Sequence, residues 1–171
     1  KLLAEEQSFI VERIRQNVLT NPMDSDIEDY TNELIQLKYN IELMKNRFNK
    51  AYNKLKAYEK AIIFAKGNPG LLEDKVENVK KTAFELQKLL NGSSSKKEIG
   101  EKDNVSINSR LSVAQRGFNT TYGPTFMHKE SLEMAKQLYK RLNPKIENFI
   151  NEDIPNIENL FKEAGVPPIL D

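Results

Sequence analysis

The only histidine of the chain, His128, stands directly after Met127. Histidine and methionine can ligate haem, but adjacent residues of a helix point in different directions, and the sequence has no haem attachment motif. Di-iron and di-manganese bundles need a Glu-x-x-His motif from each of two helices. With one histidine and no cysteine, the sequence predicts no metal site, no thiol nucleophile and no cofactor. We expect His128 to be a structural residue or a contact to a partner.

Two carboxylate pairs could in principle act as general acid and base. Glu152 and Asp153 are adjacent, and Glu130 and Glu133 are one helical turn apart. A general acid needs an enclosed cleft that raises its pKa. In a chain in which 30% of the residues are charged, such pairs also arise by chance. The sequence contains neither a phosphate-binding glycine loop nor a serine nucleophile elbow, so we predict that this segment is not an enzyme.

The composition is typical of one globular domain. The chain has 171 residues, of which 39% are hydrophobic, and 26 basic residues against 25 acidic ones give a net charge of +1. A nearly neutral protein has no long-range field for nucleic acid, and no apolar stretch approaches the roughly 20 residues of a membrane span. We expect a single domain over residues 1–171. The start at Lys1, without Met or signal peptide, suggests a piece of a longer polypeptide.

The elements that must position these residues are helices, and the strongest pattern lies between residues 25 and 66. Apolar residues recur there every seven positions, each followed by another three positions later, which predicts one long helix with a continuous seam. The seven-residue series is Ile27, Leu34, Ile41, Phe48, Leu55 and Ile62, and the series three residues later is Tyr30, Leu37, Met44, Ala51, Tyr58 and Ala65.

Helical spacing of apolar residues predicts further helices on both sides of the long one. They cover residues 9–18, 72–90, 105–119 (short, with Phe118 on the inward face) and 125–164. Pro144 and Pro155 predict a kink or break in the last helix, near Asn143 and Ile154. Residues 93–104 lack apolar periodicity and are rich in turn formers, so they should form an exposed, flexible loop. The fold prediction is all-α: an elongated up-down-up-down bundle of about four main helices with an extra short one.

The order of charges bears on topology. The long helix begins acidic, as at Glu33, and ends basic, as at Lys54, whereas the last helix has basic Lys136 near its start and acidic Glu158 near its end. Parallel placement of these two helices would pair opposite charges along their length, as an up-down-up-down bundle allows. The alternative is that the charges only solvate the outer faces, since an exposed ion pair contributes about 0 to 1 kcal/mol.

Three stretches carry a resemblance to a known family. Residues 107–111, 121–128 and 153–167 are similar to the helical C-terminal region of bacterial sortilin-like proteins built on BNR-repeat β-propellers, often labelled glycosyl hydrolase-like. Within the second stretch, Gly123 would permit a tight turn, Pro124 would fix φ, and Thr125 would cap the last helix. Arg110, Tyr122 and His128 are candidates for a docking patch at the end of the bundle.

The resemblance implies a non-catalytic structural or protein-interaction domain, because the ligand-binding machinery of that family belongs to the propeller. The implied partner is the N-terminal propeller of the same polypeptide or another envelope protein. The implied location is secreted, periplasmic or on the cell surface of a bacterium. Two alternatives stay open: an accessory part of a glycan-processing enzyme, and an oligomerisation or adhesion module based on the heptad seam. For the isolated domain we expect a monomer.

Overall fold

The computed structural model describes residues 7–10, 24–66, 69–120 and 122–166 of the chain. Its helices are α1 (Asp24–Ala61), α2 (Pro69–Asn91), α3 (Ser94–Glu98), α4 (Ile107–Gln115), α5 (Phe126–Asn148) and α6 (Ile154–Glu163). A 3₁₀ turn, η1 (Ile62–Phe64), follows α1, a second, η2 (Arg116–Asn119), follows α4, and a π-helical turn, η3 (Phe149–Asp153), joins α5 to α6. The described residues contain no β-strand, which confirms the all-α prediction.

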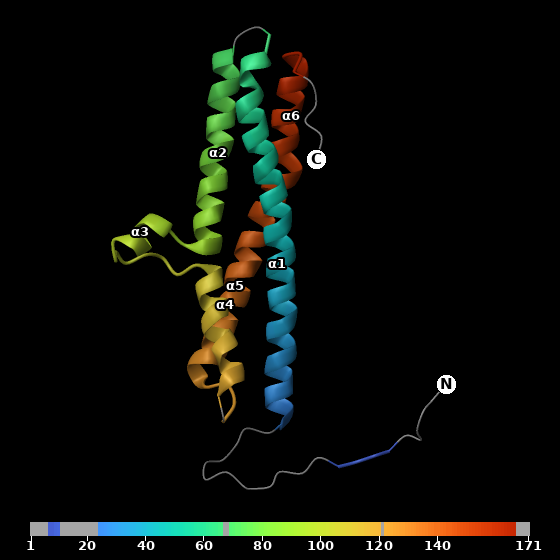
Figure 1. Cartoon of the computed structure of the whole chain (residues 1–171), viewed down its shortest axis with the longest axis vertical. Helices are drawn as coiled ribbons and strands as arrows, with labels where there is room; N and C mark the ends of the chain where they lie inside the picture. Colours follow the sequence, from blue (N-terminus) through green and yellow to red (C-terminus); the bar gives the residue numbers. More distant parts are fainter. Residues whose placement is uncertain (1–6, 11–23, 67–68, 121, 167–171) are drawn as a thin grey trace.

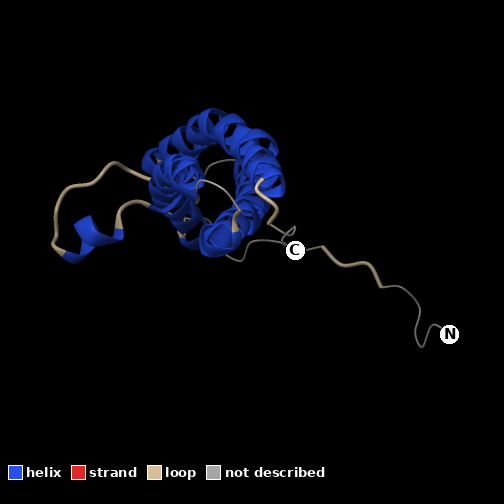
Figure 2. Ribbon diagram, turned by 90° about the horizontal axis from the view of Figure 1, so that it is seen from above, coloured by secondary structure: helices blue, strands red, loops and turns tan. Residues whose placement is uncertain are grey.

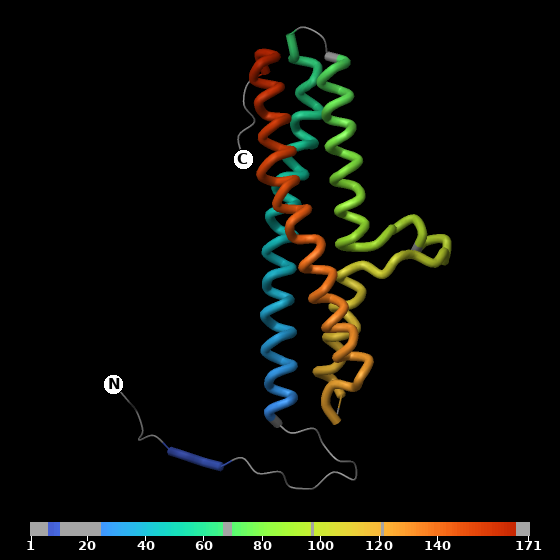
Figure 3. Tube along the Cα trace, turned by 180° about the vertical axis from the view of Figure 1, so that it is seen from behind, coloured from blue at the N-terminus to red at the C-terminus, as the bar shows by residue number. Residues whose placement is uncertain are grey.

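The helices form three arms (Figure 1). Helix α1 runs the full length of the bundle, α2 returns beside its upper part, and α4 continues in the same direction beside its lower part. The third arm, α5 followed by α6, runs parallel to α1 and shifts from beside α4 to beside α2 as it rises (Figure 3). Seen from above, the arms surround a common axis (Figure 2).

The heptad seam of α1 forms one side of the core. All but two of its twelve residues are buried, the exceptions being Ile27 and Ala65 near the ends. Large aromatic residues join this seam to the third arm: the ring centroids of Phe48 and Phe149 are 5.4 Å apart, and those of Tyr58 and Phe161 are 4.8 Å apart. The apolar stripes of the other arms complete the core, because each arm is amphipathic and must bury one face.

Ion pairs confirm the parallel arrangement of α1 and the third arm. Lys136 Nζ lies 2.7 Å from Glu33 Oε2 near the lower end, and Lys54 Nζ lies 2.5 Å from Glu158 Oε1 near the upper end. Between them, the guanidinium of Arg47 forms a two-pronged contact with Glu147. The opposite charge gradients of the two arms are therefore paired across the bundle rather than only solvated.

The first helix predicted, over residues 9–18, falls mainly outside the described residues. Phe9 and Ile10, which are described, are not helical and are exposed. The fourth arm of an up-down-up-down arrangement would have to come from this part of the chain. The described bundle is up, down and up, with α2 and α4 sharing the descending arm.

Residues 93–104 project sideways from the junction of α2 and α4 (Figures 1 and 2), and most of their described side chains are exposed. It is not all loop, because α3 forms inside it. The Ser93 hydroxyl accepts a hydrogen bond from the Lys96 N–H at 3.4 Å, and the Ser93 N–H donates to Asp103 Oδ2 at 2.6 Å. Local capping thus builds a short helix that has no apolar periodicity to predict it.

The two prolines of the third arm behave differently. Pro144 lies inside α5 without ending the helix, so no break occurs at Asn143. Pro155 stands in the first turn of α6, directly after the π-helical turn η3. Proline cannot donate the helical hydrogen bond that its position requires, and the wider π-helical turn accommodates that loss. Near Ile154 the chain therefore stays helical, and the predicted kink or break takes the form of a change from π-helical to α-helical hydrogen bonding.

Candidate functional site

Of the three residues predicted as a docking patch, the structure brings two to the same end of the bundle. Tyr122 lies in the turn before α5 and His128 in the first turn of α5, both at the lower end in Figure 1. Arg110 lies in the first turn of α4, at the opposite end of that helix from the turn. The rest of α4 and η2 separate it from Tyr122, so the proposed three-residue patch is not a single cluster.

His128 has a structural role in this position. The backbone N–H of Thr125, the N-cap residue of α5, donates a hydrogen bond to His128 Nδ1 at 3.1 Å. The Thr125 side chain accepts from the backbone of the same turn, so the two residues form a reciprocal capping box. The predicted cap at Thr125 is confirmed, and His128 takes the place that Glu or Gln usually occupies in this motif.

The turn before α5 is closed by hydrogen bonds. The Gly123 N–H donates to the carbonyl of Thr120 at 3.3 Å, and the Thr120 hydroxyl contacts the carbonyls of Gly117 and Gly123. Gly123 has a φ of 79°, a left-handed conformation that glycine adopts without strain, as the sequence predicted. Pro124 is buried beside it. These hydrogen bonds connect the described residues on the two sides of position 121.

Four large apolar side chains lie exposed around this turn: Phe118, Tyr122, Phe126 and Met127, which we call the end cluster. Phe126 is 78% exposed and Met127 is 58% exposed. Phe118 was predicted to face inward, but it is 46% exposed. Its ring packs against Tyr30 in a T-shaped arrangement, with ring centroids 6.4 Å apart, and the rest of the side chain is open to solvent. Helical periodicity did not reveal the end cluster because its members lie in turns and helix ends.

The carboxylate pair in the third arm has an unusual local setting. Asp153 ends the π-helical turn η3 and is half-buried, whereas Glu152 is exposed. Partial burial, assisted by the negative charge of Glu152, raises the pKa of the Asp153 carboxyl. Among the described residues, no group of three or more His, Asp or Glu side chains is placed to hold a metal ion.

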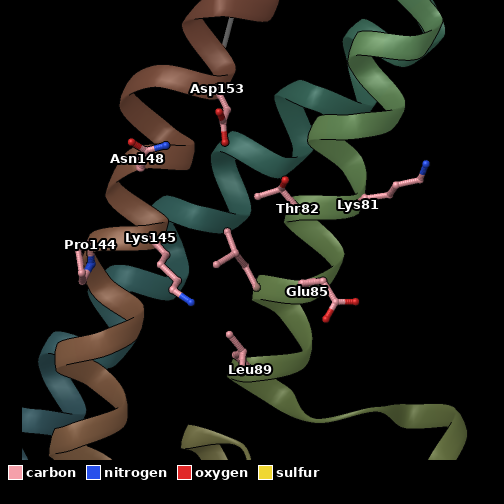
Figure 4. A pocket seen from close by; sticks show the side chains of 9 residues that line it. Lys81, Thr82, Glu85, Leu89, Pro144, Lys145, Asn148 and Asp153 are labelled. Atoms are coloured by element: carbon pink, nitrogen blue, oxygen red, sulfur yellow. The ribbon is translucent and has the colours of Figure 1, made fainter.

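Asp153 also faces a groove where α2 and α5 diverge, which we call the α2–α5 groove (Figure 4). The groove is open to solvent and has a volume of about 670 Å³. Its lining residues are Lys81, Thr82, Glu85, Leu86, Leu89, Pro144, Lys145, Asn148 and Asp153. A second hollow of about 570 Å³, farther up between α2 and α6, shares Thr82 and Asp153 with it.

The charged side chains of the groove differ in direction. Lys145 extends into the space between the helices and Asp153 points into it from above, whereas Lys81 and Glu85 point away (Figure 4). Glu85 is paired with Lys88 on its own helix at 2.9 Å. Within the described parts of the chain, neither Lys145 nor Asp153 has an ion-pair partner. The sequence did not indicate this groove, because heptad spacing on α1 says nothing about where two other arms diverge.

Comparison with known proteins adds no assignment: no protein-family model, no curated protein and no solved structure matches this chain. None of the helices in the described ranges is both long and apolar enough to cross a membrane.

Proposed function

We propose that the chain is a non-catalytic protein-interaction domain that binds its partner through the end cluster. The main observation in favour of this proposal is the exposure of three aromatic side chains and one methionine in a stretch of ten residues at one end of the bundle. Exposed large apolar side chains gathered in one region are typical of interaction sites, and aromatic residues are frequent anchors of binding energy.

Contacts beneath the end cluster should keep the loss of conformational entropy on binding small. Phe118 packs on Tyr30, whose own hydroxyl is hydrogen-bonded to α4, and the turn between them and α5 is closed by the Thr120 hydroxyl. A surface that is already held in place loses little conformational entropy when a partner binds. The end of the bundle is therefore well suited to hold anchors for another protein.

The resemblance to sortilin-like proteins supplies the partner class. Tyr122, Phe126 and Met127 all lie in residues 121–128, one of the stretches on which that resemblance depends. We propose that the partner is a BNR-type β-propeller of an exported bacterial protein, in the same polypeptide or a separate one. The heptad seam that motivated an oligomerisation module is covered by the other arms, so this surface is not open to a second copy.

The test is calorimetric titration of the domain with a purified sortilin-like propeller as a separate chain. The double variant Phe126→Ala/Met127→Ala should weaken binding about tenfold or more, as truncation of anchor residues does. The matched control is Ile63→Ala/Phe64→Ala, which removes an exposed aliphatic and an exposed aromatic side chain at the opposite end of the bundle. Equal effects of both variants, or no binding of the propeller by the wild type, would reject the proposal.

A further inference from the structure

The α2–α5 groove has the composition of a small-molecule site. Leu86 and Leu89 of α2 and Pro144 of α5 are its apolar lining residues, and its volume of about 670 Å³ lies in the range of about 300 to 1,000 Å³ that ligand pockets occupy. Such pockets combine mostly apolar walls with a few polar groups that fix the orientation of the ligand. The groove lies beside the π-helical turn η3, an irregularity that is frequent at functional sites.

Lys145 is the polar group that defines what the groove can bind. Its ammonium group projects between the helices and makes no ion pair with any described residue (Figure 4). Lys136, farther down the same helix, is by contrast paired with Glu33. Lys145 is solvent-exposed, so its ammonium group supplies the charge that attracts an anion while the apolar lining residues contact the rest of the ligand. Thr82 and Asn148 add neutral hydrogen-bonding groups to the lining.

Asp153 limits the charge of that anion. It points into the groove from the other end, eight residues beyond Lys145, which corresponds to about 12 Å along a helix. A ligand with a second negative group would approach this carboxylate without any further cation to compensate, since Lys81 is turned away. The groove therefore fits a single negative charge at the Lys145 end and an uncharged body against the leucines.

We propose that the α2–α5 groove binds an amphipathic monocarboxylate such as a medium-chain fatty acid, with its carboxylate on Lys145 and its alkyl chain along Leu86 and Leu89. This site is separate from the end cluster and does not depend on the proposed protein partner.

Three probes of equal chain length test the proposal on the whole domain: decanoate, 1-decanol and decylammonium, each below the concentration at which it aggregates. Decanoate should bind at least fivefold more tightly than either of the others in calorimetric titration at neutral pH, because it alone carries a charge opposite to that of Lys145. Equal affinities would indicate non-specific adsorption and overturn the proposal, as would the absence of decanoate binding.

Matched variants locate the carboxylate. Lys145→Gln should weaken decanoate binding at least fivefold and leave 1-decanol unaffected, whereas Lys81→Gln, at a lining residue that points away, should change neither. Methyl NMR supplies the position of the alkyl chain: decanoate should shift the Leu86 and Leu89 signals and leave the Met127 methyl signal in place. Shifts confined to Met127, or equal effects of the two lysine variants, would overturn the assignment.

Discussion

The hydroxyl of Tyr30 donates a hydrogen bond to the backbone carbonyl of Ala114 at 2.6 Å, between residues 84 positions apart in the chain. It ties the first turns of α1 to the end of α4, directly beneath the end cluster. Tyr30 is only 5% exposed, and Ala114 is fully buried. A polar group in such a place needs a partner, so this bond specifies how the lower end of the bundle closes.

Tyr30→Phe removes the hydroxyl and keeps the ring against Phe118. We expect it to lower the free energy of unfolding by about 1 kcal/mol, the typical net contribution of a buried hydrogen bond. Urea unfolding followed by circular dichroism measures the change. Tyr39→Phe is the matched control, because Tyr39 is 64% exposed and should lose no stability with its hydroxyl. Equal stability of Tyr30→Phe and the wild type would contradict the structural role of this bond.

The same residue predicts a dependence on alkaline pH. Burial raises the pKa of the Tyr30 hydroxyl above its ordinary value of 10.0. The folded state therefore retains this proton more strongly than the unfolded state, and the stabilising contribution is lost as pH rises above the unfolded value and through the folded one. Between pH 9 and pH 11 the wild type should lose more stability than Tyr30→Phe. Parallel curves for the two proteins would show that this hydroxyl does not couple folding to pH.

Gly117 is a second contact on which this end depends. A β-carbon at this position would lie 3.0 Å from the Tyr30 hydroxyl oxygen and 3.2 Å from Pro124 Cβ. Neither neighbour can move freely, since one is hydrogen-bonded and the other is buried in the turn. We expect Gly117→Ala to cost about 1 to 3 kcal/mol of stability, as overpacking does.

The control for Gly117 is Gly70→Ala, an exposed position in the first turn of α2, where alanine favours the helix. Urea unfolding should show opposite directions for the two variants, with Gly117→Ala less stable than the wild type. Loss of the end-cluster arrangement in Gly117→Ala would also weaken propeller binding. If Gly117→Ala is as stable as Gly70→Ala, Gly117 is not packed closely against Tyr30.

The parts of this molecule that the sequence predicts are those with a repeating physical cause. The heptad seam identifies the buried face of α1, because only a helix places residues seven apart on one side. The opposite charge gradients of α1 and the third arm indicate that the two run parallel. The ion pair between Lys136 and Glu33 is one of the contacts that this direction produces. The end cluster and the α2–α5 groove have no repeat behind them. They arise where a turn and two diverging arms leave side chains uncovered, which depends on packing that local spacing does not encode.

A charge exchange tests the parallel direction of the arms in solution. Glu33→Lys places a cation beside Lys136 and should lower the free energy of unfolding by about 0.5 to 1 kcal/mol, since surface pairs are worth little. Adding Lys136→Glu restores opposite charges between the two arms and should recover part of the loss, because it also replaces the contact of Lys136 with Glu133 by a repulsion between two carboxylates. Thermal unfolding at low salt measures the cycle, and 1 M salt should reduce the coupling. Additive losses in the double variant would contradict the pairing.

The last prediction concerns Asp153, because the charged form of its carboxyl is disfavoured at neutral pH. Its pKa is raised by partial burial and by Glu152, so the folded state favours the protonated form. The corresponding stability is present at acidic pH and is lost as pH rises through the folded pKa. Asp153→Asn should therefore be more stable than the wild type at pH 7, by less than about 1 kcal/mol because the side chain is partly exposed.

The advantage of Asp153→Asn should disappear when the same variants unfold at about pH 3, where the wild-type carboxyl is protonated in both states. Glu152→Gln, which removes only the weaker of the two causes, should give a smaller gain in the same direction at pH 7. If Asp153→Asn is instead destabilised at pH 7, the carboxylate makes a favourable contact in the groove. The picture of Asp153 as an uncompensated anion facing Lys145 across an apolar space would then be incorrect.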